Sequence, residues 1–343
     1  MVKPEEIKNV AKRVLTEGNV KYLIGYKRAG NGLTAAPVFI EDPNDVDQLI
    51  WDATCVQNLS RFLVDEKKAK ARQKAPDNRP VAIIAKGCDT RAVNVLLQEK
   101  YIERKDVYII GVSCETAGVC DEKKVAGKVK GKQAEAVQFK EGNRLTIVTG
   151  DGNTDVPEED ILADRCLECK ANYPVIYDVF LGEKAAKKCS NYFQSLEPVE
   201  SLTADQRWAM WQEQMDKCLR CYACRSVCPM CYCDECVVDS INLAVTVDTT
   251  AEEKAQKIRW IEKSPEVSEN AFYHMIRALH LAGRCIDCAE CERVCPVHIP
   301  LRHLNKKMEK EAKEQFDYEA GFDPEKPALV SSFRDEDPQD FIK

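Results

Sequence analysis

The sequence predicts two regions of different fold class, an α/β domain over residues 1–185 and a mainly α-helical domain over residues 216–313. In the first region, short apolar runs alternate with helix-like patterns, which is the arrangement of βαβ units. In the second region, two cysteine runs of identical spacing are accompanied by segments with helical periodicity. A polar, helical bridge at 186–215 separates the two regions, and an acidic segment follows at 314–343.

The composition excludes several classes of protein. The chain has 343 residues, enough for two or three domains with cores of their own. Its 57 acidic and 50 basic residues give a net charge of −7, so no basic field attracts nucleic acid. A run of about 18 apolar residues is absent, and the first residues lack the apolar segment of a signal peptide. We therefore expect a cytoplasmic protein without a transmembrane segment.

The α/β region is expected to begin with a helix over residues 1–17, whose apolar side chains recur at helical spacing. Val20–Tyr26 and Ala36–Ile40 have the composition of strands, and the glycines between them mark a hairpin turn. Residues 43–64 again repeat apolar side chains at helical spacing, after a side chain that can cap a helix. These patterns predict the order helix, hairpin, helix.

Two buried parallel strands are expected next. Val81–Ala85 and Val107–Val112 are uninterrupted apolar runs, and a helical segment lies between them. Ligands gather at the carboxyl ends of the strands in such a βαβ unit. Cys88 follows the first strand and Cys114 follows the second, so both thiols are expected at that edge. The alternative is that each packs there as a small hydrophobic side chain.

A further strand is expected at Leu145–Thr149, and the C-x2-C pair Cys166 and Cys169 comes after it. A single pair of this kind is compatible with zinc, with a redox dithiol or with coincidence. Because thiols are already expected at the neighbouring strand ends, the pair favours a metal cluster at this edge of the sheet. It would be a third cluster, in addition to two in the helical region.

Two cysteine runs dominate the helical region, and 18 cysteines without an export signal indicate metal ligation rather than disulfides. Each run has the spacing C-x2-C-x2-C-x3-C-P of bacterial ferredoxins, in which three close thiolates bind one [4Fe-4S] cluster and the fourth binds the other. Zinc also takes four thiolates, but two complete runs favour two clusters. We therefore assign one cluster to Cys218, Cys221, Cys224 and Cys295, and the other to Cys285, Cys288, Cys291 and Cys228.

Three more cysteines, Cys231, Cys233 and Cys236, follow the first run and have no place in a plain two-cluster ferredoxin. Three interpretations are open: a fourth cluster completed by Cys189 or Cys55, a small zinc site, or side chains that line the shell of the other clusters. The sequence does not decide between them.

Helical patterns at 251–261 and 268–282 make the region a mainly α-helical dicluster ferredoxin-like domain. Ser268 can cap the second of these helices and Gly283 can end it. We expect the histidines of the chain to pack around the clusters, because cysteine fills the ligand positions; they are His274, His280, His298 and His303.

Residues from about 20 to 185 resemble the β-subunit family of coenzyme F420 hydrogenases and dehydrogenases, which includes the β subunits of F420-linked formate dehydrogenases. The matching features are Gly32–Pro37, Lys86-Gly87-Cys88, Ser113-Cys114, Cys166-Leu-Glu-Cys169, and Asp178 with Gly182. The resemblance implies one [4Fe-4S] cluster in this region. It implies that Cys166 and Cys169 are ligands, and that Cys114 with Cys88 or Cys120 completes the set.

The same resemblance implies FAD beside that cluster, but the chain departs from the family because no Gly-rich flavin or dinucleotide fingerprint is present. FAD therefore stays open. Asn58, Lys86 and Arg91 are polar groups near the expected edge that could contact a flavin. The alternative is that they are ordinary surface or capping residues.

The helical region resembles the C-subunit of heterodisulfide reductases and the helical dicluster domain of succinate dehydrogenase iron–sulfur subunits. His280–Cys285 and Cys295–Leu301 carry this resemblance. The acidic segment at 314–343 is expected to be a docking extension that orders on a partner.

The predicted function is electron transfer, because the sequence offers several clusters and no recognisable catalytic triad, phosphate loop or acid–base pair. We expect an iron–sulfur subunit that relays electrons between catalytic subunits of an anaerobic oxidoreductase complex of formate dehydrogenase, hydrogenase or heterodisulfide reductase type. One alternative is an FAD-containing subunit that exchanges hydride with F420 or a nicotinamide and passes single electrons to its clusters. A more remote alternative is a scaffold held by structural zinc.

Overall fold

The computed structural model describes most of the chain, namely residues 2–30, 33–114, 118–140, 142, 144–184, 189, 191–234, 236, 238, 250–252, 264–330 and 332.

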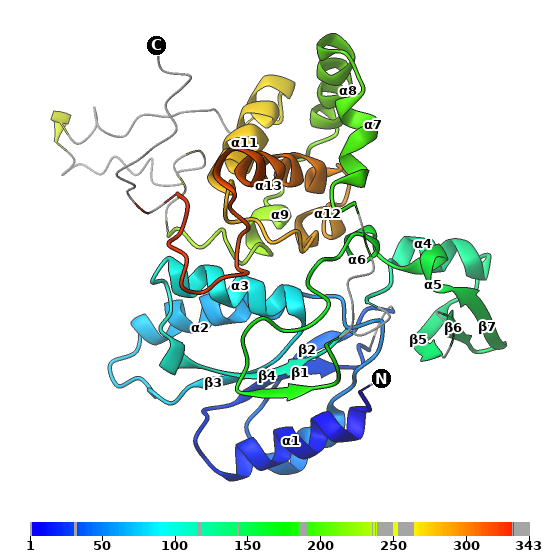
Figure 1. Ribbon diagram of the computed structural model, residues 1–343, viewed down its shortest axis with the longest axis vertical. Coiled ribbons are helices and arrows are strands. Elements are labelled where there is room, and N and C mark those ends of the chain that lie inside the picture. The colour runs from blue at the N-terminus through cyan, green and yellow to red at the C-terminus, as the bar shows by residue number, and fades with distance from the viewer. Residues whose placement is uncertain are drawn as a thin grey trace.

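A five-stranded sheet with the strand order β2-β1-β3-β4-β8 forms the centre of the N-terminal region (Figure 1). Strands β1 and β2 are an antiparallel hairpin, whereas β1, β3, β4 and β8 are parallel to one another in that order. The predicted α/β architecture is thus confirmed. The strands are β1 (Leu23–Lys27), β2 (Ala36–Ile40), β3 (Val81–Ala85), β4 (Val107–Val112) and β8 (Val179–Leu181).

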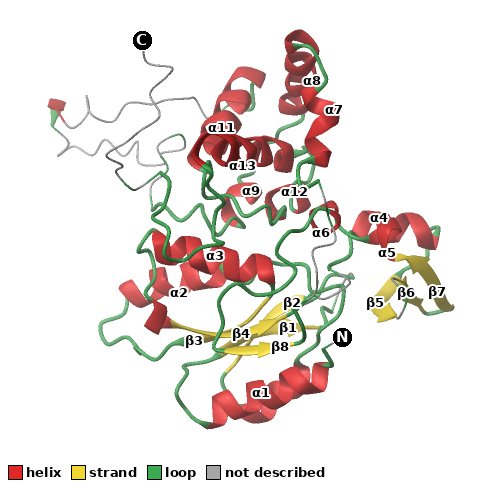
Figure 2. Ribbon diagram, in the orientation of Figure 1, coloured by secondary structure: helices red, strands yellow, loops and turns green. Residues whose placement is uncertain are grey.

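Helices cover both faces of this sheet (Figure 2). Helix α1 (Pro4–Thr16) buries its apolar stripe on one face, as the spacing of Ile7, Ala11 and Val14 predicts. Helices α2 (Arg61–Ala71) and α3 (Gly87–Gln98) lie on the other face. The parallel strands are therefore buried on both sides, which explains their uninterrupted apolar sequences.

The helix predicted over residues 43–64 is wrong in its middle part. The structure has a 3-10 helix η1 at Pro43–Gln48, and α2 begins only at Arg61. Between them the chain turns irregularly, and the Asp52 carboxylate accepts a hydrogen bond from the Thr54 backbone N–H at 2.8 Å. Such a local turn competes with a helix. The apolar residues of this segment recur because it is buried, not because it is helical.

A second, three-stranded antiparallel sheet is inserted between β4 and β8. Helices α4 (Glu122–Val129) and α5 (Glu158–Ile161) accompany it, and the three form an apolar core of their own. The strand predicted at Leu145–Thr149 is confirmed as β6, although it belongs to this sheet and not to the central one. The strands are β5 (Ala134–Lys140), β6 (Arg144–Thr149) and β7 (Gly152–Pro157).

The helical region lies on the α3 side of the central sheet (Figure 1). The predicted helix at 268–282 is confirmed as α11, whereas most of the helix predicted at 251–261 falls outside the described residues, as does most of residues 331–343. The bridge contains η3 (Gln194–Leu196), α7 (Glu197–Glu200) and α8 (Ala204–Asp216), and the helical region contains α9 (Ala223–Ser226), α11 (Val267–His280), α12 (Glu290–Arg293) and α13 (Leu301–Phe316). A further 3-10 helix, η2 (Arg104–Asp106), precedes β4 in the α/β region.

The two regions share one apolar core. Met230 and Ile286 of the helical region and Tyr318 of the segment after α13 pack in the same cluster as Val93 and Leu96 of α3. The segment after α13 therefore lies on α3 as part of the fold. Among the described helices, none is long and apolar enough to cross a membrane.

Candidate metal centres

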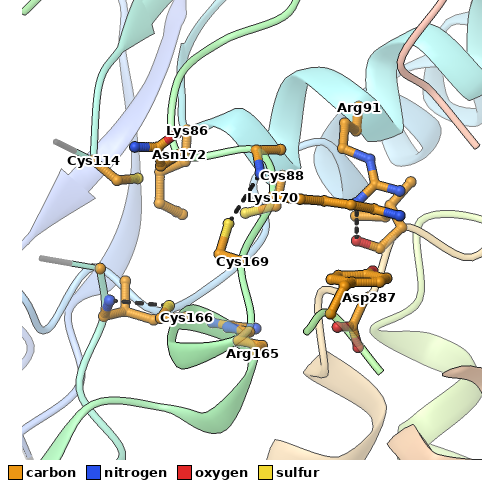
Figure 3. A pocket seen from close by; sticks show the side chains of 15 residues that line it. Lys86, Cys88, Arg91, Cys114, Arg165, Cys166, Cys169, Lys170, Asn172 and Asp287 are labelled. Atoms are coloured by element: carbon orange, nitrogen blue, oxygen red, sulfur yellow. Dashed lines mark hydrogen bonds between the residues drawn. The ribbon is translucent and has the colours of Figure 1, made fainter. Parts of the chain in front are cut away.

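Four cysteines from separate parts of the chain line one cavity at the carboxyl edge of the central sheet. We call them the first cysteine set: Cys88, Cys114, Cys166 and Cys169. Cys88 lies in the first turn of α3, Cys114 follows β4, and the other two come from α6 (Asp164–Leu167) and the turn after it. The cavity has an empty volume of about 680 Å³ and is partly open to solvent. Figure 3 shows the four side chains around this space, with Asp287 of the helical region at one side.

Backbone groups close around the sulfurs of this set. The Val119 N–H donates to Cys166 Sγ at 3.3 Å, and the Ala171 N–H donates to Cys169 Sγ at 3.3 Å. Gly118 has a φ of +144°, and a Cβ atom there would lie 2.7 Å from the Cys166 Cβ. Hydrogen bonds from backbone amides to thiolates are a recurring feature of iron–sulfur sites. The donor set therefore fits a cluster.

Burial makes Cys88 and Cys169 of the first set poor acids. It raises the pKa of Cys88 to about 12 and that of Cys169 to about 11, while Lys86 and Arg165 lower the pKa of Cys88 in part. As free side chains these cysteines are protonated at neutral pH. Metal ions that replace the protons would remove the cost of burying the thiolates.

Cys120, the alternative fourth member of this set, lies elsewhere. It is buried in the core of the three-stranded sheet, and its backbone pairs with Leu162. The structure thus brings Cys88, rather than Cys120, to the cavity that the other three cysteines line.

The two cysteine runs of the helical region share one backbone conformation. The residue before each second cysteine and the residue after it both have left-handed φ angles, 55° at Arg220 and 62° at Tyr222 in the first run, 53° at Asp287 and 52° at Ala289 in the second. Each such non-glycine residue costs on the order of 1 kcal/mol. The same strained turn, recurring between cysteines in both runs, indicates a shape that a common ligand requires.

A second cavity, of about 410 Å³, lies within the second run. The second cysteine set lines it: Cys228, Cys285, Cys288 and Cys291. The fourth cysteine of the first run thus joins three from the second run. Ile286 and Asp287 line this cavity and also the cavity of the first set, so the two cavities have a common wall.

The third cysteine set consists of Cys218, Cys221, Cys224 and Cys295. Cys218, Cys224 and Cys295 are buried in one apolar cluster, whereas Cys221 is exposed. Burial and then the neighbouring Cys295 raise the pKa of Cys218.

Polar groups surround the sulfurs of the third set. Arg277 Nη1 donates to Cys224 Sγ at 3.3 Å. A ring nitrogen of His274 lies 3.3 Å from Cys218 Sγ, and burial lowers the pKa of this histidine to about 3, so that it is neutral. His274 thus packs beside a cysteine, as the sequence analysis expects of the histidines.

The additional cysteines are dispersed. Cys231 lies beside Cys228 and 3.7 Å from Arg277 Nη2, whereas Cys233 is exposed and Cys236 is half-buried. The two candidate fourth ligands contact carbonyls elsewhere, Cys55 that of Ile50 and Cys189 that of Asn191. Among the described side chains, no group of three or more His, Cys, Asp or Glu could hold a single metal ion. A cubane differs in this respect, because each thiolate binds a different iron.

The three predicted flavin contacts are buried and bonded within the protein. Asn58 donates to the Cys88 carbonyl at 3.5 Å, and Lys86 Nζ lies 3.2 Å from the Asp89 carboxylate. All three nitrogen atoms of the Arg91 guanidinium donate to residues of the helical region or of the segment after α13. Contact of these side chains with a flavin stays a prediction.

A further cavity, of about 400 Å³, adjoins that of the first set and shares Lys86 and Cys114 with it. Trp51 and Phe139 also line it, and neither was predicted from the sequence. Both belong to segments that come to the sheet edge only through the fold, so no local pattern marks them.

Charged residues that the sequence patterns did not indicate also lie between the first and second sets. Glu168 and Asp287 are buried, and each stands directly before the second cysteine of a C-x2-C pair. Burial opposes their ionisation, but Arg302 and Lys306 outweigh it and hold the pKa of both carboxyls below the ordinary values. An acid at this position in both pairs is the signal that could have found them.

Comparisons with known proteins give relatives over nearly the whole chain, although no family model matches it. Subunit beta of the F420-dependent formate dehydrogenase of Methanocaldococcus jannaschii is 21% identical over 93% of this chain and 92% of its own length. Subunit beta of F420-dependent formate dehydrogenase 1 of Methanococcus maripaludis is 22% identical over 93% of this chain and 91% of its own length. The resemblance to the β subunits of F420-linked formate dehydrogenases is confirmed.

This β-subunit resemblance extends into the helical region, since the alignments include 93% of the chain. Among solved structures, a chain of the F420-reducing [NiFe] hydrogenase complex from Methanosarcina barkeri aligns at 15% identity and a TM-score of 0.36, covering 47% of this chain and 57% of that chain. The resemblance of the helical region to the heterodisulfide reductase C-subunit stays a prediction.

Proposed function

We propose that this β-subunit-like chain is an iron–sulfur subunit that relays electrons in an F420-linked oxidoreductase complex. One observation carries the proposal: three sets of four cysteines follow one another. Ile286 and Asp287 lie between the first and second sets, and Arg277 joins Cys224 of the third set to Cys231, which lies beside Cys228 of the second. Each set supplies the four thiolates that one [4Fe-4S] cluster needs, and such clusters supply one-electron redox chemistry when bound. Neighbouring centres of this kind form a path for electrons.

Both ends of this path are accessible to solvent. The first set lies in a cavity that is partly open to solvent, beside the cavity with Trp51 and Phe139. At the other end Cys221 of the third set is exposed. Electrons can therefore be exchanged with partners at both ends. Because the relatives are subunits of F420-dependent formate dehydrogenases, one expected partner is a catalytic formate dehydrogenase subunit.

A second candidate function is an FAD-containing subunit that takes hydride from reduced F420 or a nicotinamide. The adjoining cavity favours it, because Trp51 and Phe139 offer aromatic surface to a flavin ring, and Lys86 faces both cavities. A flavin converts a two-electron donor to one-electron acceptors, so its place next to the first set would be chemically suitable.

The metal and flavin content of anaerobically purified protein tests both candidates. We expect about 12 irons and about 12 sulfides per chain, four of each for every cysteine set. About 8 irons would contradict a cluster in the first set, and zinc in place of iron would overturn the relay. One flavin per chain would favour the second candidate function, and its absence would favour the first.

Substitution of Cys88 by serine is expected to remove one cluster, because Cys88 lines the cavity of the first set. The iron content should fall from about 12 to about 8 per chain, measured by iron analysis and by EPR of the reduced protein. The matched control is Cys120→Ser, which alters a buried thiol outside the cavity. Loss of iron in the Cys120 variant alone would assign the fourth ligand to Cys120.

A further inference from the structure

The loops of the first and second cysteine sets meet through buried charges. Glu168 lies within the Cys166–Cys169 pair, and Asp287 lies within the Cys285–Cys288 pair. These two acids come from different regions of the chain, 119 positions apart (287 − 168). Two cations of α13, one helical turn apart, bind both of them.

The contacts are close and balanced in charge. Arg302 Nη2 lies 2.5 Å from the Glu168 carboxylate, and its Nε and Nη2 lie 2.6 Å and 2.7 Å from the two Asp287 oxygens. Lys306 Nζ lies 2.6 Å from Glu168 and 2.9 Å from Asp287. The side chains of Arg302 and Lys306 are only 3% and 0% exposed. Two acids thus face two bases away from water.

A second buried ion pair repeats the arrangement. Arg165, directly before Cys166, donates from Nη1 to the Glu290 carboxylate at 3.0 Å, and Glu290 stands directly before Cys291. Arg165 Nη2 also donates to the Val56 carbonyl at 2.5 Å. Residues at both ends of the Cys166–Cys169 pair are therefore linked to loops of the second set. Arg165 is linked directly, and Glu168 is linked through the two cations of α13.

The position of these buried charges indicates their role better than their number does. A buried ion pair is weak evidence for stability, because apolar side chains of similar volume often stabilise as well or better. In the third set, the equivalent position before the second cysteine holds Arg220, which donates to Asn270 at 3.3 Å. The acid-to-cation link thus occurs where two cysteine sets from different regions face each other.

We infer that the residues of these two links, which we call the inter-site clamp, position the first and second cysteine sets for electron transfer and set the difference between their reduction potentials. The clamp consists of Glu168, Asp287, Arg302, Lys306, Arg165 and Glu290. The inference rests on the proposed relay. In the transfer step one electron leaves one site, which is oxidised, and reaches the other, which is reduced; no bond forms or breaks. The clamp residues are positioning residues, because they act through the cysteine loops.

The test compares Glu168→Gln with Lys306→Gln in the full-length protein. In Glu168→Gln, Arg302 and Lys306 keep Asp287 as a partner, so α13 stays attached to the second set while its link to the first set weakens. Removing a negative charge should raise the potential of the first site, and removing the Lys306 charge should lower the potentials of both sites. We expect shifts of about 59 mV, which is a tenfold change in a one-electron equilibrium.

Two measurements distinguish a role of the clamp in positioning the two cysteine sets from a role in protein stability alone. Redox titration followed by EPR gives the potentials, and the magnetic interaction between the two reduced sites reports their separation. We expect opposite signs of the potential shift in the two variants and a weaker interaction in Glu168→Gln. Shifts of the same sign, or unchanged potentials and interaction with about 12 irons retained, would overturn the clamp and leave the relay intact.

The matched control is Glu200→Gln. Glu200 also binds two cations of α13, Lys307 at 2.8 Å and Lys310 at 2.6 Å, but it lies at no cysteine loop. We expect potentials and magnetic interaction equal to those of the wild type. If Glu168→Gln does not retain iron, Lys306→Arg takes its place in the comparison, because it keeps the positive charge. Equal potentials in Lys306→Arg and Lys306→Gln would then overturn the inference. Wild-type protein without iron–sulfur clusters would instead refute the proposed function.

Discussion

Arg91→Met is expected to lower the free energy of unfolding by about 3 kcal/mol, because it breaks a buried ion pair and removes two further hydrogen bonds. Arg91 donates to the Ala320 carbonyl at 3.0 Å and to the Ile286 carbonyl at 3.1 Å, and its Nη2 lies 3.2 Å from Glu309. Lys170, 3.7 Å from the same carboxylate, stays as a weaker partner, so we expect the lower end of the usual range. Anaerobic urea unfolding, followed by tryptophan fluorescence, measures the effect against the wild type.

The control for this variant is Lys105→Met, which breaks an exposed pair with Glu103 and should change stability by less than about 1 kcal/mol. Flavin content gives a second readout. If flavin binds the wild type, an Arg91 variant of normal stability that has lost the flavin would contradict the structural role and favour the flavin contact that the sequence suggests.

Gly87→Ala is expected to remove the cluster of the first set, because the added Cβ would overlap the Ala171 carbonyl oxygen and lie 2.8 Å from the Tyr173 oxygen. The segment after Cys169 would have to move away from the first turn of α3, which carries Cys88. Overpacking of this kind costs about 1–3 kcal/mol or more. We expect the iron content to fall by about four per chain, measured on anaerobically purified protein.

Gly127→Ala is the matched control for this substitution. Gly127 lies in α4, and a Cβ atom there would meet nothing within 4 Å. The change should retain all the iron and stabilise the helix by about 0.5–1 kcal/mol, since alanine is the better helix former. Equal iron contents in the Gly87 and Gly127 variants would show that the close approach at Gly87 does not support the first set.

Several elements could be predicted because their signals are local. Strands Val81–Ala85 and Val107–Val112 have the predicted bounds, since strands buried on both faces need uninterrupted apolar sequences. The helix Val267–His280 follows from its periodicity. The helix prediction at 43–64 failed for a related reason. The apolar side chains among residues 49–60, such as Leu49, Cys55 and Leu59, are buried, and burial without regular hydrogen bonding imitates a helical pattern.

The sequence by itself determined which thiols stand close along the chain, because a ligand that binds several cysteines within one turn imposes short, regular spacings. Only the tertiary structure decided that Cys88, and not Cys120, joins Cys114, Cys166 and Cys169 in one cavity. It also decided that Glu168 and Asp287 meet on α13. Such contacts join residues of different elements, so they depend on how the sheet edge and the helices pack. No local pattern of side chains records that packing.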